Sequence, residues 1–278
     1  MTELQKVELD MLKWLVRICN QLDLTYYLVC GSALGAVKYG GFIPWDDDID
    51  VAFPRQDYEL FLEKANEFLP KHLFLQNYRT EKCYYALGSK LRNSQTTYIE
   101  KGIEHLPMNH GVFIDIFPLD GYPVDKREIR AFERRKKYFY RRRYVCLKPV
   151  FHRDLGLTLC SILNRCIGMY KNVFFYVESN EKLNRRYSCV ESEYWCNYAN
   201  SISSKEYAPK EQYGAGTMMK FEGLDVRVPE KYDEYLTQKY GNWRADPPKE
   251  QQVGHHYYSV MDLNKPYTEY FKEMKKEK

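Results

Sequence analysis

The sequence predicts an α+β fold in which helices flank a mixed β-sheet. Two observations lead to this class. Some stretches place apolar residues at helical spacing, and several short runs between them show the alternation of a strand. The chain has 278 residues, of which 44% are hydrophobic and 29% charged, so it can bury one sizeable core. We therefore expect a single domain over residues 1–278.

The first expected element is an amphipathic helix over residues 3–23, whose apolar positions recur at helical spacing. The run Tyr26–Cys30 follows. It is apolar and aromatic, which predicts a buried strand.

Gly31 and Ser32 end that strand and introduce a short helix over residues 33–39. Ser32 is the predicted N-cap of this helix, and Gly31 lets the backbone come close to a bound group. Gly40-Gly41 stop the helix. Because free N–H groups at a helix start suit an anion, we expect a phosphate to be bound there.

A cluster of aspartates comes next. Asp48 and Asp50 alternate with Ile49 and Val51, which is the period of a strand, so both carboxylates project from one face. Two charges about 5–6 Å apart repel by a few kcal/mol at an effective dielectric of about 20. A hard divalent cation would turn these carboxylates into ligands. The pattern predicts a Mg²⁺ site, with Mn²⁺ as the alternative ion.

Other interpretations of the aspartates were weighed. An EF-hand loop starting at Asp46 would need Gly at its sixth position and Glu at its twelfth, where the chain has Val51 and Asp57. That interpretation fails. A solvated acidic turn is disfavoured because the acids interrupt an apolar strand. A metal-dependent glycosyltransferase that uses a nucleotide sugar and an Asp48-Ile49-Asp50 motif stays open.

A second helix is expected from Arg55 until Pro70 ends it. Short strands follow it: Phe74–Gln76, Tyr84–Leu91, Thr96–Ile99 and Val112–Phe117. In the second of these strands Lys90 and Arg92 share one face. They are predicted to neutralise phosphate groups of a substrate if that face borders the site.

Asp115 lies among large apolar residues of the last of these strands. An ionised Asp is costly to bury unpaired. We therefore expect it to face the same cavity as Asp48 and Asp50. Asp120, which follows Pro118-Leu119, is interpreted as a turn residue.

Residues 126–143 are densely basic and contain few helix breakers, which predicts a charged helix. Either solvent or an anionic surface such as lipid headgroups could cover it. A moderately apolar segment over residues 155–178 is interrupted by Arg165 and Lys171, so it is expected to pack or to lie at an interface rather than to span a membrane. We interpret residues 122–187 as a mainly helical, basic insertion.

The remaining composition narrows the class further. The formal net charge is +4 and no nucleic-acid-binding module is visible, so no nucleic-acid partner is expected. The eight cysteines include no C-x₂-C pair, which disfavours a zinc site. No signal peptide is evident, so the expected location is cytoplasmic, with peripheral contact to the inner face of the membrane through residues 126–143.

The string GSALGAVKYGGFIPWDDDIDVAF closely resembles the LicD family of phosphotransferases, which has the nucleotidyltransferase superfold and is related to fukutin-type proteins. The likeness is clear over residues 1–120. It returns in KFEGLDVRVPEKYDEYLTQKYGNWRADPP, so residues 219–262 are expected to pack back on the core. Glu222 would then lie near the site. His255-His256 match a family position with a His, and a surface or packing role for them stays open.

The resemblance implies a nucleotidyltransferase-like mixed sheet in which Asp115 is a third carboxylate. Asp48, Asp50 and Asp115 would be catalytic and hold metal, while Gly31 and Ser32 would contact phosphate. The implied reaction moves phosphocholine or a related polyol phosphate from a CDP-activated donor to a hydroxyl of a cell-surface glycan precursor, for a capsule, lipopolysaccharide or teichoic acid. A catalytically silent glycan-binding protein is the remaining alternative.

Overall fold

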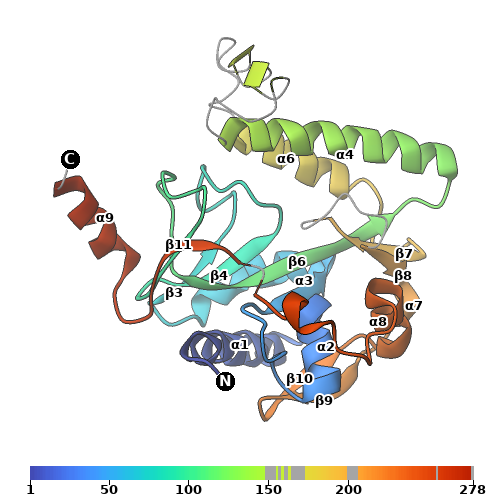
Figure 1. The fold of residues 1–278 in the computed structure, drawn as a ribbon. Helices are drawn as coiled ribbons and strands as arrows, with labels where there is room; N and C mark the ends of the chain where they lie inside the picture. Colours follow the sequence, from blue (N-terminus) through green and yellow to red (C-terminus); the bar gives the residue numbers. More distant parts are fainter. Residues whose placement is uncertain are drawn as a thin grey trace.

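A mixed sheet forms the centre of the molecule (Figure 1). The computed structural model describes residues 1–147, 155, 158–159, 162–163, 173–198, 206–254 and 256–276. Within these residues, five strands of the sheet lie in the order β1 (Tyr27–Leu28), β2 (Asp50–Pro54), β6 (Val112–Tyr122), β4 (Ser89–Asn93) and β3 (Leu73–Gln76). β7 (Tyr194–Asn197) pairs with β6, and β8 (Tyr207–Pro209) pairs with β7. Only the β2–β6 pair is parallel among these described pairs. The predicted mixed sheet is confirmed.

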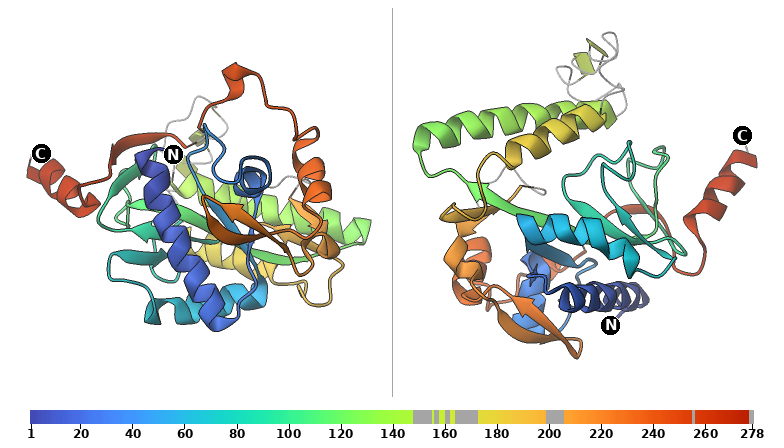
Figure 2. Two further views of the ribbon diagram at one scale, coloured as in Figure 1. Left: turned by 90° about the horizontal axis from the view of Figure 1, so that it is seen from below. Right: turned by 180° about the vertical axis from the view of Figure 1, so that it is seen from behind.

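Helices lie on both sides of this sheet, as Figures 1 and 2 show. α4 (Lys126–Leu147) and α6 (Val173–Asn184) run side by side along one side, and α1 (Glu3–Leu22) packs against β6 from the other. α3 (Arg55–Lys64) continues into the 3-10 turn η1 (Ala65–Glu67), and α2 (Cys30–Tyr39) lies beside α8 (Tyr232–Tyr240). No helix in the described ranges is both long and apolar enough to cross a membrane.

The N-terminal elements follow the sequence pattern closely. Thr2 and Gln5 form a capping box at the start of α1, and Asp23 ends the helix in the left-handed conformation. The expected strand Tyr26–Cys30 is shorter than predicted, because Cys30 already begins α2. Ser32 is therefore not the N-cap, which was predicted wrongly; that position belongs to Val29.

The C-terminal part of the chain contacts the N-terminal part. β9 (Thr217–Phe221) and β10 (Leu224–Val228) form a hairpin, and the backbone N–H of Glu222 in its turn donates to Gly40 O at 2.8 Å. Tyr235 in α8 accepts a hydrogen bond from the backbone N–H of Cys30 at 3.1 Å. These contacts bring the end of the chain to the start of α2.

Smaller elements complete the described fold. They are α7 (Lys210–Tyr213), the 3-10 turn η3 (Lys249–Gln251), the β5–β11 pair (Thr97–Glu100 and Tyr258–Asp262) and α9 (Tyr267–Lys276). The predicted basic helix over 126–143 is confirmed by α4. Most of the predicted segment over 155–178 lies outside the described residues.

Candidate metal and phosphate site

Three carboxylates meet at the start of the paired strands β2 and β6. Oxygens of Asp48, Asp50 and Asp115 lie within 4.8 Å of one another. Asp50 is the first residue of β2 and is directly in register with Asp115 in β6, while Asp48 lies in the loop just before β2. The structure thus brings together the three acids that the sequence pattern selected.

A serine in the first turn of α2 holds this strand in place. Ser32 is buried, and its hydroxyl accepts a hydrogen bond from the backbone N–H of Asp50 at 2.8 Å. The backbone N–H of Val29 donates to Asp50 O at 3.1 Å. The first turn of α2 is therefore tied directly to the residue that carries one of the acids.

Gly31 faces Asp46. A Cβ atom at Gly31 would lie 2.6 Å from Asp46 Oδ2, so the absence of a side chain lets this carboxylate approach the helix start. In this structure the anionic group beside the predicted phosphate position is Asp46. Phosphate binding by Gly31 and Ser32 stays a prediction.

The acidic cluster is electrostatically unfavourable by itself. Burial raises the pKa of Asp48 and Asp50, and the neighbouring carboxylates raise that of Asp50 further. Burial and the charge of Asp48 raise the pKa of Asp46 to about 8. Hard oxygen ligands that repel one another suit a hard cation such as Mg²⁺. The donor set therefore fits the predicted ion.

Lys90 borders this cluster, as predicted. It is in register with Asp115 on the neighbouring strand β4, and its Nζ lies 3.3 Å from Asp115 Oδ1. The same Nζ lies 3.2 Å from the centroid of the Phe113 ring and 3.5 Å from Glu100. This ammonium is positioned to neutralise charge at the acids or on a bound phosphate.

Arg92 takes a different position from the one expected for a phosphate ligand. It is fully buried, and its guanidinium donates to Gln76 Oε1 at 2.7 Å and to Gly111 O at 2.8 Å. It also pairs with Glu100 at 2.7 Å. Because it has three protein partners and no exposed surface, Arg92 stabilises the strands behind the site. It is not placed to contact a substrate directly. The alternation of the strand correctly predicted that Lys90 and Arg92 share one face of β4, but not that Arg92 is completely buried.

Glu100 links Lys90 and Arg92, and its charge should make stability depend on pH. Burial opposes its ionisation, but the charges of Lys90 and Arg92 lower its pKa from 4.5 to about 2. A lowered carboxyl pKa stabilises the fold above pH 4.5 and loses that stabilisation as the pH falls toward 2.

Glu100→Gln should therefore make the free energy of unfolding less dependent on pH below about pH 4.5. From pH 6 to pH 3, we expect the free energy of unfolding to fall by roughly 2 kcal/mol more in the wild type than in the variant. Urea titrations at the two pH values would measure this difference. Equal losses in both proteins would contradict the pairing.

His256 joins the site from the C-terminal segment. Its backbone N–H donates to Asp47 Oδ2 at 3.2 Å, and its Nδ1 lies 3.4 Å from Asp47 Oδ1 and 3.6 Å from Asp48 Oδ2. Burial lowers the pKa of His256, but the Asp47 hydrogen bond and the Asp48 charge raise it overall. Asp47 therefore links the C-terminal segment to the loop that carries the acids. His255 lies outside the described residues.

Two further residues near the site were not selected as site residues from the sequence. Glu8, on α1, is 2% exposed; burial and the charge of Asp48 raise its pKa. Its position on the apolar face of that helix, four residues from Leu4 and from Leu12, was the available signal. Tyr240, the last residue of α8, is 42% exposed.

Glu222 contacts the loop that leads to the acids. Its Oε1 accepts a hydrogen bond from the backbone N–H of Phe42 at 3.2 Å. A Cβ at Gly41 would lie 2.1 Å from the same oxygen, so this glycine is needed for the close approach. Glu222 thus positions the loop and does not reach the acid cluster itself.

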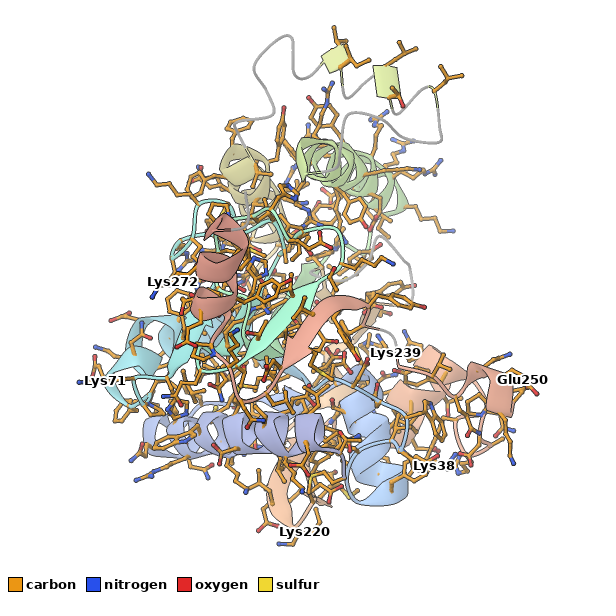
Figure 3. All side chains as sticks on the ribbon, turned by 60° about the vertical axis from the view of Figure 1, so that its left-hand side comes forward. Lys38, Lys71, Lys220, Lys239, Glu250 and Lys272 are labelled. Carbon is orange, nitrogen blue, oxygen red and sulfur yellow. The ribbon has the colours of Figure 1, made fainter. Side chains whose placement is uncertain are left out.

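The acids open into a cavity of about 890 Å³. Asp46, Asp48 and Asp50 line one part of its wall together with Ile43 and Trp45 of the preceding loop, and residues from α2, the end of α8 and the segment that follows α8 line the rest. Figure 3 labels Lys38 on α2 and Glu250 in η3, two residues of this wall, on the same side of the molecule. The metal and phosphate site is therefore open to a ligand of substantial size.

The structure places Asp50 and Asp115 on adjacent parallel strands of a mixed sheet, beside Gly31 and Ser32 at the start of α2, as expected of a nucleotidyltransferase-type domain. Residues 23–155 match the sequence profile of the family described as LicD/FKTN/FKRP, nucleotidyltransferase domain. This match, together with the similarity to a LicD protein described next, confirms the resemblance inferred from the motifs.

Two relatives place the match in context. The chain is 28% identical over 261 residues to the lipopolysaccharide cholinephosphotransferase LicD of Haemophilus influenzae, covering 91% of this chain and 95% of that protein. It is also 29% identical over 101 residues to the uncharacterized protein RP689 of Rickettsia prowazekii, covering 36% of this chain and 34% of that protein. The first similarity extends well beyond the domain profile.

Proposed function

We propose that this protein is a Mg²⁺-dependent phosphotransferase that moves phosphocholine from a CDP-activated donor to a hydroxyl group of lipopolysaccharide or a related glycan precursor. The observation that carries the proposal is the cluster of Asp48, Asp50 and Asp115, whose oxygens lie within 4.8 Å of one another. The choice of phosphocholine and of a lipopolysaccharide acceptor rests on the name of the Haemophilus relative.

Asp48, Asp50 and Asp115 would hold the ion. When bound, Mg²⁺ would neutralise charge on the donor phosphates and stabilise the charge that develops during transfer. Gly31 and Ser32, at the start of α2, would lie beside those phosphates. Lys90, 3.3 Å from Asp115, would add a positive charge at the same place.

The reaction exchanges one P–O bond for another. The acceptor hydroxyl oxygen forms a bond to the phosphorus that carries choline, and the bond from that phosphorus to the bridging oxygen breaks. The bridging oxygen leaves with CMP. The hydroxyl proton passes to a carboxylate, for which Asp115 is our candidate because it lies in the acid cluster on the central strand.

Product analysis tests this proposal directly. The purified protein is incubated with CDP-choline and lipopolysaccharide, and CMP release and the product mass are measured. We expect a phosphodiester-linked phosphocholine, no reaction with EDTA, and recovery with Mg²⁺ or Mn²⁺. A glycosidic product from a nucleotide sugar would instead support a glycosyltransferase. No thermal stabilisation by CDP and Mg²⁺ together would support a silent glycan-binding protein.

We also propose that the outer face of α4 contacts the anionic surface of a membrane. Exposed basic residues recur along this helix: Lys126, Arg127, Arg130, Arg134, Arg135 and Lys137. Tyr138, 48% exposed, adds an aromatic ring of the kind found at membrane interfaces. The buried side of the helix packs through Phe132, which leaves the basic side outward.

Replacing Arg127, Arg130 and Arg134 together by Ala should weaken binding to anionic vesicles. Each basic residue near such a surface contributes about 1 kcal/mol, so we expect roughly a hundredfold loss. Cosedimentation with phosphatidylglycerol vesicles measures it. The matched control is Lys71→Ala/Lys220→Ala/Lys272→Ala, three lysines that Figure 3 shows away from α4. Equal binding by both triple variants would contradict the proposal.

A further inference from the structure

The wall of the large cavity gathers exposed aromatic side chains beside the acid cluster. Tyr39 ends α2, Tyr240 ends α8, and Tyr257 directly precedes β11; they are 36%, 42% and 74% exposed. Large apolar side chains exposed at one place commonly mark a binding surface. Three segments far apart in sequence supply these rings, so the fold assembles the surface and no local motif predicts it.

Trp45 adds a further ring, directly before the aspartates. Its ring centroid lies 6.3 Å from that of Tyr39, with an angle of 79° between the planes. Trp45, Tyr39 and Tyr240 all line the same cavity. Because the face of an aromatic ring is electronegative, such an arrangement favours a cation.

The charge of the wall agrees with a cationic ligand group. Five carboxylates line the cavity (Asp46, Asp48, Asp50, Asp246 and Glu250), against one lysine, Lys38. Lys38 is already paired with Asp246 at 2.5 Å, so its charge is matched locally. A bound metal ion would offset the acids of the cluster, but Glu250 stands apart from them on η3. Among the residues that the structure describes, the part of the wall beyond the cluster therefore has no unmatched positive charge.

We propose that this aromatic and acidic wall binds the quaternary ammonium group of the donor, with Trp45 and Tyr240 as its principal rings. The inference rests on the proposed phosphocholine transfer and adds the residues that select choline over polyol phosphates. A polyol head group such as glycerol carries hydroxyls and no charge, and it would gain little from ring faces. The donor would thus extend from its phosphates at the aspartates to its methyl groups at the rings.

Equilibrium binding of four donors tests this assignment: CDP-choline, CDP-ethanolamine, CDP-glycerol, and the analogue of CDP-choline with carbon in place of nitrogen. Titration calorimetry with Mg²⁺ and without acceptor gives the Kd values. In the wild type we expect CDP-choline to bind about tenfold more tightly than the uncharged analogue. Its advantage over CDP-glycerol should be larger than about tenfold. CDP-ethanolamine, which has the charge without the methyl groups, should fall between.

The variants separate the rings from the rest of the site. Trp45→Ala and Tyr240→Ala should each raise the Kd for CDP-choline about tenfold and that for CDP-glycerol less than twofold. Trp45→Phe should keep most of the preference. The control is Phe175→Ala, since Phe175 is a 53% exposed ring on α6 outside the cavity wall. Melting temperatures of all variants verify folding.

Distinct results would overturn the assignment. Equal losses for all four donors would mean that the rings stack on the cytosine base, and equal binding of the uncharged analogue would mean an apolar pocket without charge selection. Failure of the proposed function is visible separately. In that case the wild type would prefer CDP-choline in binding but would release no CMP when lipopolysaccharide is added.

Discussion

Asp50→Asn is expected to lower the rate of phosphocholine transfer about a thousandfold or more while the protein stays folded. Asn is nearly isosteric with Asp, and the backbone N–H of residue 50 can still donate to Ser32 Oγ. What is lost is one negative oxygen ligand from a cluster of three. Because the remaining acids repel each other less, the melting temperature without metal should not fall.

CMP release from CDP-choline, measured over a range of Mg²⁺ concentrations, gives the rate. Asp115→Asn should produce a loss of similar size, and the double variant should be little worse than either single one, since the residues act as a unit. Asp10→Asn, at an exposed position on α1, is the matched control. Turnover near the wild-type rate in folded Asp50→Asn protein would refute the role of the cluster.

The part of this site that could be predicted depends on short-range patterns. The alternation around Asp50 and the apolar run around Asp115 each indicate a strand. Parallel pairing of those strands then puts the two residues opposite each other. Asp48 lies before β2 and still reaches the same cluster. Its predicted place beside Asp50 was therefore correct, although the strand alternation used to predict it does not apply to a residue outside the strand.

Contacts made by chain segments far apart in sequence could not be predicted in the same way. His256 reaches Asp47 across 209 residues, and Tyr240 lines the cavity from the end of α8. Neither has a local pattern that distinguishes it from a packing residue. Arg92 shows the opposite failure, because a strand period reveals which face a side chain takes but not how deeply that face is buried.

Asp120 is the residue whose role differs most from its prediction. It was interpreted as a turn residue after Pro118, yet β6 continues through that proline to Tyr122. Pro118 falls between the stretch of β6 paired with β4, which ends at Ile116, and the stretch paired with β7, which begins at Leu119. Asp120 therefore lies in a buried strand, 1% exposed, and needs a partner.

Arg55 is that partner, and it links three elements. Its Nε donates to Asp120 Oδ1 at 2.7 Å and one terminal nitrogen pairs with Asp120 Oδ2 at 2.5 Å. The other terminal nitrogen lies 3.2 Å from Glu181 on α6. The guanidinium thus connects α3, the end of β6 and a helix of the basic insertion. A bidentate pair with this geometry is among the stronger interactions of its kind.

Arg55→Met should therefore be strongly destabilising, because it leaves the carboxylates of Asp120 and Glu181 buried without their cation. Removing one partner of a buried ion pair costs about 3–5 kcal/mol, and we expect the melting temperature to fall by roughly 10 °C. Asp120→Asn should cost less, since Arg55 keeps its contacts with Glu181 and Glu59. The double variant should show a clear coupling energy in a mutant cycle.

An exposed pair at the end of the same helix, between the last residue of α3 and η1, provides the comparison. Lys64 lies 3.5 Å from Glu67, with side-chain exposures of 39% and 60%, so Lys64→Met should leave the free energy of unfolding almost unchanged. Urea unfolding of both variants decides the matter. If Arg55→Met proved as mild as Lys64→Met, the buried network would have no special part in joining the insertion to the sheet. If the large loss is found, α6 is held to the core by charge as well as by packing. The stability of the insertion would then depend on the strand that carries Asp115 at its other end.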